Sequence, residues 1–126
     1  MEIKKCIPIF RIFDEEKARE FYIDWLGFNI DWVDRPEDTP IYMPISRGGL
    51  VLHLSEHYGD CCPGSRIFIA MGKEELEVYH AELTSKEYKY MKPELEPMPW
   101  SELTFDVWDP FGNRISFNAM KEMPEL

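Results

Sequence analysis

The sequence lacks any segment that could enter a membrane. No run of about 18 residues is apolar enough to span a bilayer. The first residues, Met1-Glu2-Ile3-Lys4-Lys5, carry neither the apolar stretch nor the small-residue cleavage site of a signal peptide. We therefore expect a cytoplasmic protein with no membrane partner.

Basic residues are also scarce. The chain has 14 lysines and arginines against 24 aspartates and glutamates, which gives a net charge of -10. Such a charge repels the phosphate backbone of nucleic acids and attracts cations. We therefore expect no nucleic-acid partner, and a cationic small molecule is the favoured ligand.

Cysteine is scarce as well, with only Cys6, Cys61 and Cys62 in the chain. An odd number that includes an adjacent pair does not make a disulfide framework, and cytosolic thiols stay reduced. The C-x-x-C spacing of many zinc sites is absent. We interpret the adjacent pair as loop residues that precede Pro63-Gly64.

What the sequence contains is the same order of strand and helix patterns, twice. At 126 residues, 44% of them apolar, the chain can bury one core. Alternation and turn residues predict strands at 3–12, 28–33, 41–46 and 50–55 in the first half. In the second half they predict strands at 66–71, 103–108 and 114–118, and a helix at about 73–86 with Leu76, Tyr79, His80 and Leu83 on one side. The repeat places Ser116 in the second half at the position of His53 in the first.

The first helix has clear start and stop signals. Asp14 precedes the acidic pair Glu15-Glu16, as an N-cap residue does, and Gly27 stands where a helix often ends in a left-handed glycine. Between them, apolar residues recur at helical spacing: Ala18, Phe21, Tyr22, Trp25 and Leu26.

Two motifs resemble those of a known superfamily. The segment Asp14-x-Glu16-x-Ala18-x-x-Phe21-Tyr22-x-x-x-Leu26-Gly27-Phe28 is similar to the helix signature of the vicinal oxygen chelate group of glyoxalases, bleomycin-resistance proteins and extradiol dioxygenases. The turn Asp109-Pro110-x-Gly112-Asn113 is similar to a later signature of that group. The resemblance implies an α+β fold of two βαβββ modules, whose curled mixed sheets form a cup that is usually completed by dimerisation. It assigns residues 1–126 to one domain, with module one at about 1–57 and module two at about 65–120.

The resemblance also bears on catalysis. Enzymes of this superfamily place His, Glu or Gln metal ligands on the first and last strands of each module. Here the strands at 3–12 and 66–71 contain none of these residue types, and the last strands offer His53 and Ser116. A divalent metal needs several such ligands, so we expect no metal, no cofactor and no catalytic residue. A glyoxalase-type or dioxygenase-type metal-dependent lyase or oxygenase, with an atypical site around His53 and Glu56, remains the alternative.

Strand alternation predicts which residues line the cup. If the more apolar faces meet the helices, Leu50, Leu52 and Leu54 point inward, and Val51, His53 and Ser55 line the cavity. In the last hairpin the same rule predicts that six residues line the cavity: Thr104, Asp106, Trp108, Arg114, Ser116 and Asn118. A turn with a left-handed Gly112 would place Asp106 opposite Ser116.

Within the superfamily, the bleomycin-resistance branch is the most similar. The segment Pro99-Trp100-x-x-x-x-Phe105-x-x-x-Asp109-Pro110-x-Gly112-Asn113 resembles the part of those proteins that carries a ligand-stacking tryptophan, and residues 31–34 resemble their acidic and aromatic second strand. The resemblance implies a homodimer that sequesters a cationic glycopeptide of the bleomycin type in two interface clefts, without chemical change. The candidate ligand-binding residues are Trp32, Asp34, His53, Ser55, Phe68, Trp100, Asp106, Trp108 and Ser116.

The tryptophans near acids support this choice, because flat rings stack on planar or cationic ligands. Trp32 lies between Asp31 and Asp34, and Trp108 lies between Asp106 and Asp109. Buried core tryptophans beside solvated acids, or a scaffold without an antibiotic role, are the other interpretations left open.

Overall fold

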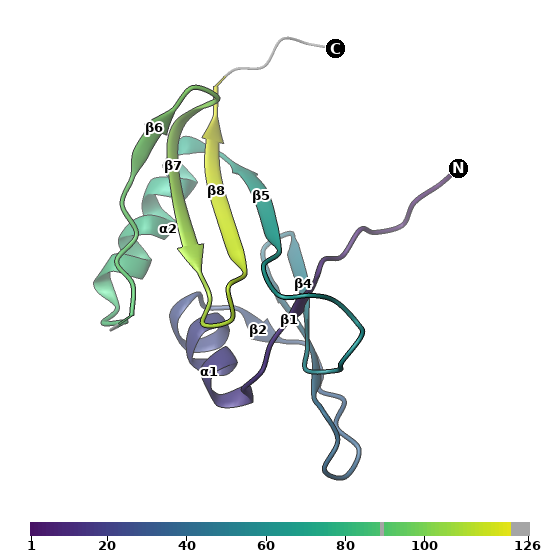
Figure 1. The fold of residues 1–126 in the computed structure, drawn as a ribbon. Helices are drawn as coiled ribbons and strands as arrows, with labels where there is room; N and C mark the ends of the chain where they lie inside the picture. The colour runs from purple at the N-terminus through teal and green to yellow at the C-terminus, as the bar shows by residue number, and fades with distance from the viewer. Residues whose placement is uncertain (89, 122–126) are drawn as a thin grey trace. The chain divides into compact units, whose positions relative to one another are not determined.

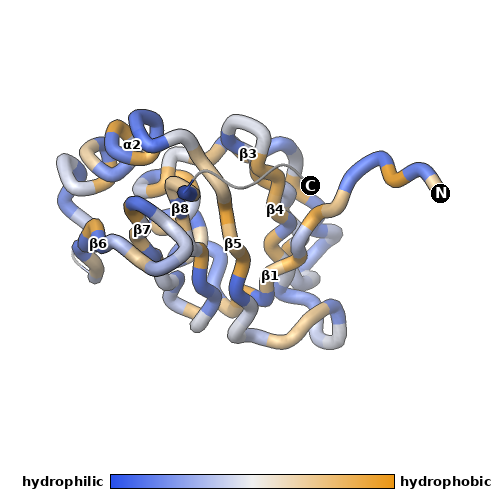
Figure 2. The backbone as a smooth tube through the Cα atoms, turned by 90° about the horizontal axis from the view of Figure 1, so that it is seen from above, coloured by the Kyte–Doolittle hydropathy of each residue, from blue (hydrophilic) through white to orange (hydrophobic). Residues whose placement is uncertain are grey.

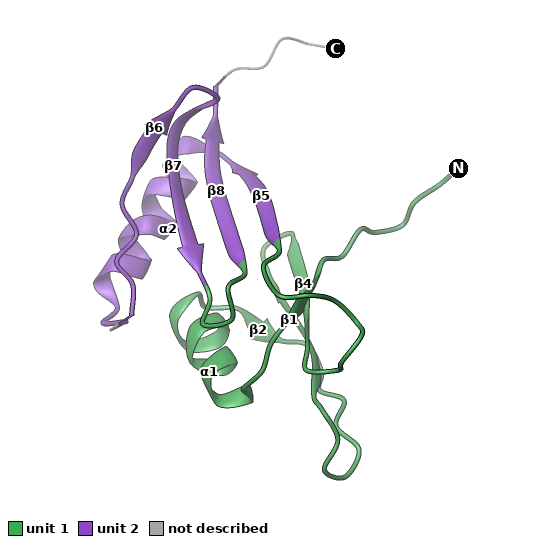
Figure 3. Cartoon of the chain, in the orientation of Figure 1, with its two compact units in different colours: residues 1–65, 109–113 green, residues 66–108, 114–126 purple. Residues whose placement is uncertain are grey.

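The computed structural model describes residues 1–88 and 90–121, which form two compact units with one four-stranded sheet each (Figures 1 and 3). Unit 1 contains Met1–Ser65 and also Asp109–Asn113. Unit 2 contains Arg66–Trp108 and the chain from Arg114 onward. Of the helices in this described part of the chain, none has the length and apolar character that crossing a bilayer requires.

Unit 1 has the order strand, helix and three strands. Its elements are β1 (Ile9–Arg11), α1 (Glu15–Arg19), the π-helix η1 (Glu20–Trp25), β2 (Asn29–Ile30), β3 (Tyr42–Arg47) and β4 (Leu50–Ser55). The sheet has the strand order β1-β4-β3-β2, in which β1 runs parallel to β4 and the other pairs are antiparallel.

Unit 2 repeats this plan. Its elements are β5 (Arg66–Met71), α2 (Lys73–Ser85), β6 (Glu96–Met98), β7 (Ser101–Trp108) and β8 (Arg114–Met120). The strand order is β5-β8-β7-β6, and β5 is parallel to β8. The expected α+β fold of two βαβββ modules with mixed sheets is therefore confirmed.

The first helix begins as the sequence predicts. The Asp14 side chain accepts a hydrogen bond of 2.9 Å from the backbone N–H of Lys17, and Gly27 after the helix has φ +79°. The second half of the helix is wider than expected, because Leu26 donates its N–H to the carbonyl of Phe21, five residues earlier.

One face of the unit 1 sheet is fully buried. Cross-strand register places on this face Phe10, Met43, Ile45, Leu52 and Leu54, none more than 1% exposed. Burial of each such side chain stabilises the fold by roughly 1.5–3 kcal/mol. The expected inward direction of Leu52 and Leu54 is confirmed.

In unit 2, helix α2 covers one face of the sheet. The Tyr79 ring lies 5.3 Å from Phe117 and 6.1 Å from Phe105, and Leu76 and Leu83 are buried on the same helix. Polar and apolar stretches succeed one another along α2 (Figure 2), as expected for a helix with one buried side.

The last hairpin has the predicted register. Asp106 lies opposite Ser116, and Gly112 in the turn has φ +91°. Trp108 pairs with Arg114, and the backbone N–H of Asp109 bonds the carbonyl of Asn113, so residues 110–112 form the tip.

Three strand predictions were wrong in extent or missing. The strand expected at 3–12 is only Ile9–Arg11, which pairs with His53–Ser55 of β4. The strand expected at 28–33 is only Asn29–Ile30, followed by an isolated bridge between Asp34 and Tyr42. The sequence did not predict β6, because Pro97 lies within it and proline argues against a strand unless it is an edge strand, as β6 is.

Candidate functional site

The second face of the unit 1 sheet carries polar and aromatic residues. Cross-strand register places Ile9 and Pro44 on either side of His53, and Arg11 and Tyr42 on either side of Ser55. We call this surface the His53 face; it comprises Ile9, Arg11, Tyr42, Pro44, His53 and Ser55.

Tyr42 is the centre of an aromatic group on the His53 face. Its hydroxyl lies 2.7 Å from Nδ1 of His53, and the two rings meet edge to face at 5.3 Å. The Trp32 ring stacks on Tyr42 at 6.1 Å with an interplanar angle of 26°. The His57 ring lies 6.4 Å from Tyr42 on another side. These contacts fix the plane of the half-exposed Trp32 ring.

Burial raises the pKa of Tyr42 and so keeps its hydroxyl protonated. The carboxylate of Asp60 and, to a smaller extent, Cys61 raise this pKa further. A protonated phenol can donate to Nδ1 of His53, and a neutral imidazole would then carry its own hydrogen on Nε2. That N–H is a donor that a ligand could use.

Ser55 holds the loop that follows β4. Its hydroxyl donates to Oδ2 of Asp60 at 2.6 Å and accepts from the backbone N–H of His57 at 3.1 Å. Ser55 is fully buried. The candidate Ser55 therefore supports the loop. Asp34, a candidate outside this face, is exposed and pairs through its backbone with Tyr42.

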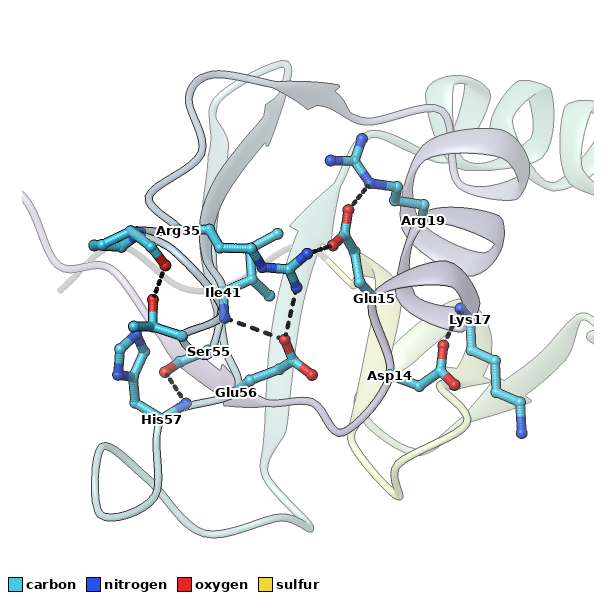
Figure 4. A network of polar contacts seen from close by, with 11 residues as sticks. Asp14, Glu15, Lys17, Arg19, Arg35, Ile41, Ser55, Glu56 and His57 are labelled. Carbon is cyan, nitrogen blue, oxygen red and sulfur yellow. Dashed lines mark hydrogen bonds and ion pairs between the residues drawn. The ribbon is translucent and has the colours of Figure 1, made fainter.

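The side chain of Glu56 forms its contacts with residues other than His53. Its Oε1 accepts from the backbone N–H of Ile41 at 3.1 Å and from Arg35 at 3.2 Å, and Arg35 also pairs with Glu15 (Figure 4). Strand alternation continued past Ser55 directs Glu56 to the face opposite His53. The structure therefore does not bring together the His53 and Glu56 on which the enzyme alternative depends.

In unit 2 the face opposite α2 carries the remaining candidates. Register places Ser116 between Phe68 and Asp106, and Asn118 beside Thr104. We call this surface the Ser116 face; it comprises Phe68, Thr104, Asp106, Trp108, Arg114, Ser116 and Asn118.

A hydrogen-bond chain fixes Trp100 on the Ser116 face. Asn118 Oδ1 accepts from the Trp100 indole N–H at 3.1 Å and from the Thr104 hydroxyl at 2.8 Å. The Asn118 amide donates to the carbonyl and the hydroxyl oxygen of Ser116 at 3.1 and 3.2 Å. Asn118, Thr104 and Ser116 are buried, so this chain is a rigid support for the partly exposed indole.

The ring of Trp108 is held by the charged side chain of Arg114. Arg114 donates to Asp106 Oδ2 and lies over the Trp108 ring, 4.8 Å from its centroid. Arg114 therefore neutralises Asp106 and covers one face of the indole. Asp106 Oδ1 is buried and has no hydrogen-bond partner among the residues that the structure describes.

The four positions that the resemblance implies for metal ligands carry few suitable side chains. Register pairs Ile9 with His53 in unit 1 and Phe68 with Ser116 in unit 2. Only His53 is a ligand of the type that divalent metals prefer, and its Nδ1 already faces Tyr42. Within the described part of the chain, no three His, Cys, Asp or Glu side chains are grouped so that they could hold a metal. These donors do not fit a divalent metal site.

Two central residues were missing from the candidate list. Tyr42 shares the face of His53, and alternation along residues 41–46 was the signal that could have found it. Asn118 was expected to line the cavity, but no sequence pattern indicated its bond to Trp100, because the two residues are 18 positions apart.

The sequence model of a family described as "Glyoxalase superfamily protein" matches residues 1–123. No curated protein matches the sequence significantly.

Several solved structures share the fold. A bleomycin-binding protein from Streptomyces verticillus, in complex with copper(II)-bleomycin, is 24% identical with a TM-score of 0.69 over 96% of this chain and 99% of that one. An antibiotic-binding protein from Streptomyces sp. CB03234 is 21% identical with a TM-score of 0.64 over 96% and 100%. A fosfomycin resistance protein from Mesorhizobium loti is 8% identical with a TM-score of 0.66 over 96% and 94%. At these identities the likeness establishes a common fold.

Proposed function

This chain belongs to the glyoxalase superfamily, and we propose that it binds and sequesters a flat, cationic antibiotic of the bleomycin type. The ligand would leave unchanged, because binding alone keeps such a molecule from its DNA target. We further propose that two copies of the chain form the binding clefts at their interface.

The observation that carries this proposal is a set of four exposed aromatic rings, of which the three tryptophans are held by neighbouring side chains. Trp32, Phe68, Trp100 and Trp108 are 54%, 49%, 44% and 48% exposed. Trp32 is stacked on Tyr42, Trp100 is bonded to Asn118, and Trp108 lies beneath Arg114. A flat ligand gains about 0.5–1.5 kcal/mol per stacked ring, and a ring that is already fixed loses little entropy on binding.

The surroundings of Trp32 and of Trp108 differ in charge. The net charge of -10 attracts a cation over long distances. Asp31 and Asp34 are exposed beside Trp32, whereas Asp106 beside Trp108 is neutralised by Arg114. The surface around Trp32 therefore suits a cationic group, whereas the surface around Trp100 and Trp108 offers stacking to a flat group without excess negative charge.

The related bleomycin-binding protein supports the choice of ligand, since its structure contains copper(II)-bleomycin. The residue pairs Ile9 with His53 in unit 1 and Phe68 with Ser116 in unit 2 each offer few metal ligands, which supports binding without metal chemistry. No step of the proposal requires a catalytic group.

Titration of the purified protein with copper(II)-bleomycin tests the proposal. We expect quenching of tryptophan fluorescence and a heat of binding at micromolar ligand. Mass spectrometry of the released ligand should show an unchanged mass, and light scattering should give the mass of a dimer. Absence of both quenching and heat at micromolar concentration would exclude bleomycin, and a modified ligand would favour an enzyme.

A further inference from the structure

Two arginines lie side by side at one end of the Ser116 face. The parallel pairing of β5 with β8 places Arg66 beside Arg114, and the antiparallel pairing of β8 with β7 places Arg114 opposite Trp108 (Figure 1). Residues that are paired in this way direct their side chains to the same face of a sheet. A chain with a net charge of -10 therefore carries a pair of adjacent positive charges on this face.

Among the residues that the structure describes, only one of the two arginines is neutralised. Arg114 donates from Nε to Asp106 Oδ2 at 2.9 Å, and Nη2 donates to the same oxygen. Arg66 is exposed, and no carboxylate in the described part of the chain forms an ion pair with it. Like charges that lie beside each other on a sheet destabilise it, and Asp106 offsets only one of them. The pair therefore keeps a net positive charge, which an anionic ligand would balance.

The chemistry of the two side chains favours an oxyanion. A guanidinium group presents its N–H donors in a planar fork, which matches the oxygens of a carboxylate or a phosphate. Arg114 is held in place by Asp106 and by the Trp108 ring, whose centroid lies 4.8 Å from the guanidinium carbon. A donor that is already fixed loses little entropy when a ligand binds. Arg114 is thus the preorganised member of the pair, and Arg66 supplies the unbalanced charge.

An exposed aromatic ring lies next to the arginine pair. Phe68 follows Arg66 by two residues on β5, so both side chains are directed to the Ser116 face, about 6.6 Å apart along the strand. The Phe68 side chain is 49% exposed, which leaves much of it open to a ligand. A ligand whose oxyanion contacts Arg66 could therefore place a ring that carries this oxyanion against Phe68.

We propose that Arg66, Arg114 and Phe68 form a binding site for an oxyanion that is carried on a flat ring, as in an aryl carboxylate or an aryl phosphate. The two guanidinium groups contact the oxyanion, and Phe68 contacts the ring. Binding is noncovalent. This ligand is opposite in charge to the cationic antibiotic proposed above, so the site goes beyond the proposed function and does not rest on it.

Benzoate and phenyl phosphate are the probes, and NMR titration of the ¹⁵N-labelled chain at low salt measures their affinities. The tighter of the two shows which oxyanion the site prefers. Benzamide, the neutral analogue of benzoate, should bind about 10-fold more weakly than benzoate, because it lacks the charge. Arg66→Gln should weaken binding of both anions by about 10-fold. Lys73→Gln removes one positive charge from the start of α2, which covers the other face of the sheet, and should bind both like the unmodified chain.

The ring contact has its own readout. The unmodified chain should bind phenyl phosphate about 3- to 10-fold more tightly than methyl phosphate, and Phe68→Leu should remove this preference while methyl phosphate still binds. Circular dichroism checks that each variant is folded. Equal affinity for benzoate and benzamide in the unmodified chain, or equal affinity for the anions in Arg66→Gln and Lys73→Gln, would overturn the oxyanion site. Equal affinity for the two phosphates in the unmodified chain would overturn the ring contact. Titration of the unmodified chain with copper(II)-bleomycin tests the proposed function separately, so that either proposal can fail alone.

Discussion

The hydroxyl of Tyr22 in η1 donates a 2.6 Å hydrogen bond to Oδ2 of Asp109 in the turn after β7. Asp109 is only 6% exposed, and its carboxylate also accepts from Phe111 N–H, Asn113 N–H and the Asn113 amide, each at 2.8 Å. The Asn113 amide group also donates to the carbonyl of Arg11 at 2.9 Å. These bonds join the turn 109–113 to the rest of unit 1. Burial nevertheless raises the pKa of Asp109, with the hydrogen bonds opposing that rise.

Tyr22→Phe should therefore destabilise the fold in a pH-dependent manner. A hydrogen bond to a charged carboxylate contributes about 1.5–3 kcal/mol, and its loss should raise the pKa of Asp109 further. The bond favours the ionised carboxylate, so the loss in unfolding free energy should be full at neutral pH and should shrink as the pH falls through the pKa of Asp109. Urea denaturation at several pH values measures this. Tyr58→Phe, at a fully exposed tyrosine, is the control; an effect of Tyr22→Phe that does not vary with pH would contradict the assignment.

Gly112→Ala and Gly49→Ala form a matched pair. An added Cβ meets no atom within 4 Å at either position, but only Gly112 has a left-handed φ, +91°. A side chain in that conformation costs about 1–2 kcal/mol. We expect this loss in the unfolding free energy of Gly112→Ala and a change within about 0.5 kcal/mol for Gly49→Ala. Similar losses in both would mean that backbone conformation is not the cause.

Trp100 should contribute to ligand binding through its ring. Trp100→Ala should weaken binding of copper(II)-bleomycin by about 3- to 10-fold, since one stacking contact is lost. Trp100→Phe keeps a ring but loses the N–H that donates to Asn118. The affinity of this variant for copper(II)-bleomycin should therefore lie between those of the unmodified chain and Trp100→Ala. Calorimetric titration measures the affinity of the unmodified chain and of both variants. Val78→Ala, on the exposed side of α2, should bind like the unmodified chain; equal affinity in Trp100→Ala would remove this ring from the site.

Arg35 links the start of α1 to the end of β4 through Glu15 and Glu56. Its side chain is half-exposed, so screening limits its contribution to about 0.5–1 kcal/mol. Arg19 and then Arg35 lower the pKa of Glu15, against a rise caused by burial. Because its pKa is lowered, ionised Glu15 stabilises the fold at pH values above the pKa of an unfolded glutamate. This stabilisation is lost as the pH falls through the lowered pKa of Glu15 in the folded protein. Arg35→Gln should lose most stability at neutral pH and low salt, and the loss should fade at 1 M salt or acid pH.

Lys4→Gln is the control for that measurement, because Lys4 pairs with Glu2 where both side chains are almost fully exposed. Thermal unfolding of both variants at low and high salt compares them. A salt-independent loss in Arg35→Gln would indicate packing of its aliphatic part in place of charge.

Much of the fold was determined by local sequence. Asp14 and Gly27 fixed the ends of the first helix, because capping depends on residues within one turn of the chain. Alternation identified the buried Leu52 and Leu54, since neighbouring strand residues must face opposite ways. The turn with Gly112 set the register of the last hairpin, because its two strands are joined by only a few residues.

The site depended on contacts between distant residues, and only the tertiary structure decided it. The sequence placed Asp106 among acids that attract cations, yet Arg114 neutralises it and covers Trp108. Sequence also left open what supports Trp100 and Trp32, which are held by Asn118 and Tyr42. Local chemistry specifies helix ends and strand faces, whereas the partner of a charge or a ring depends on which segments the sheet brings side by side.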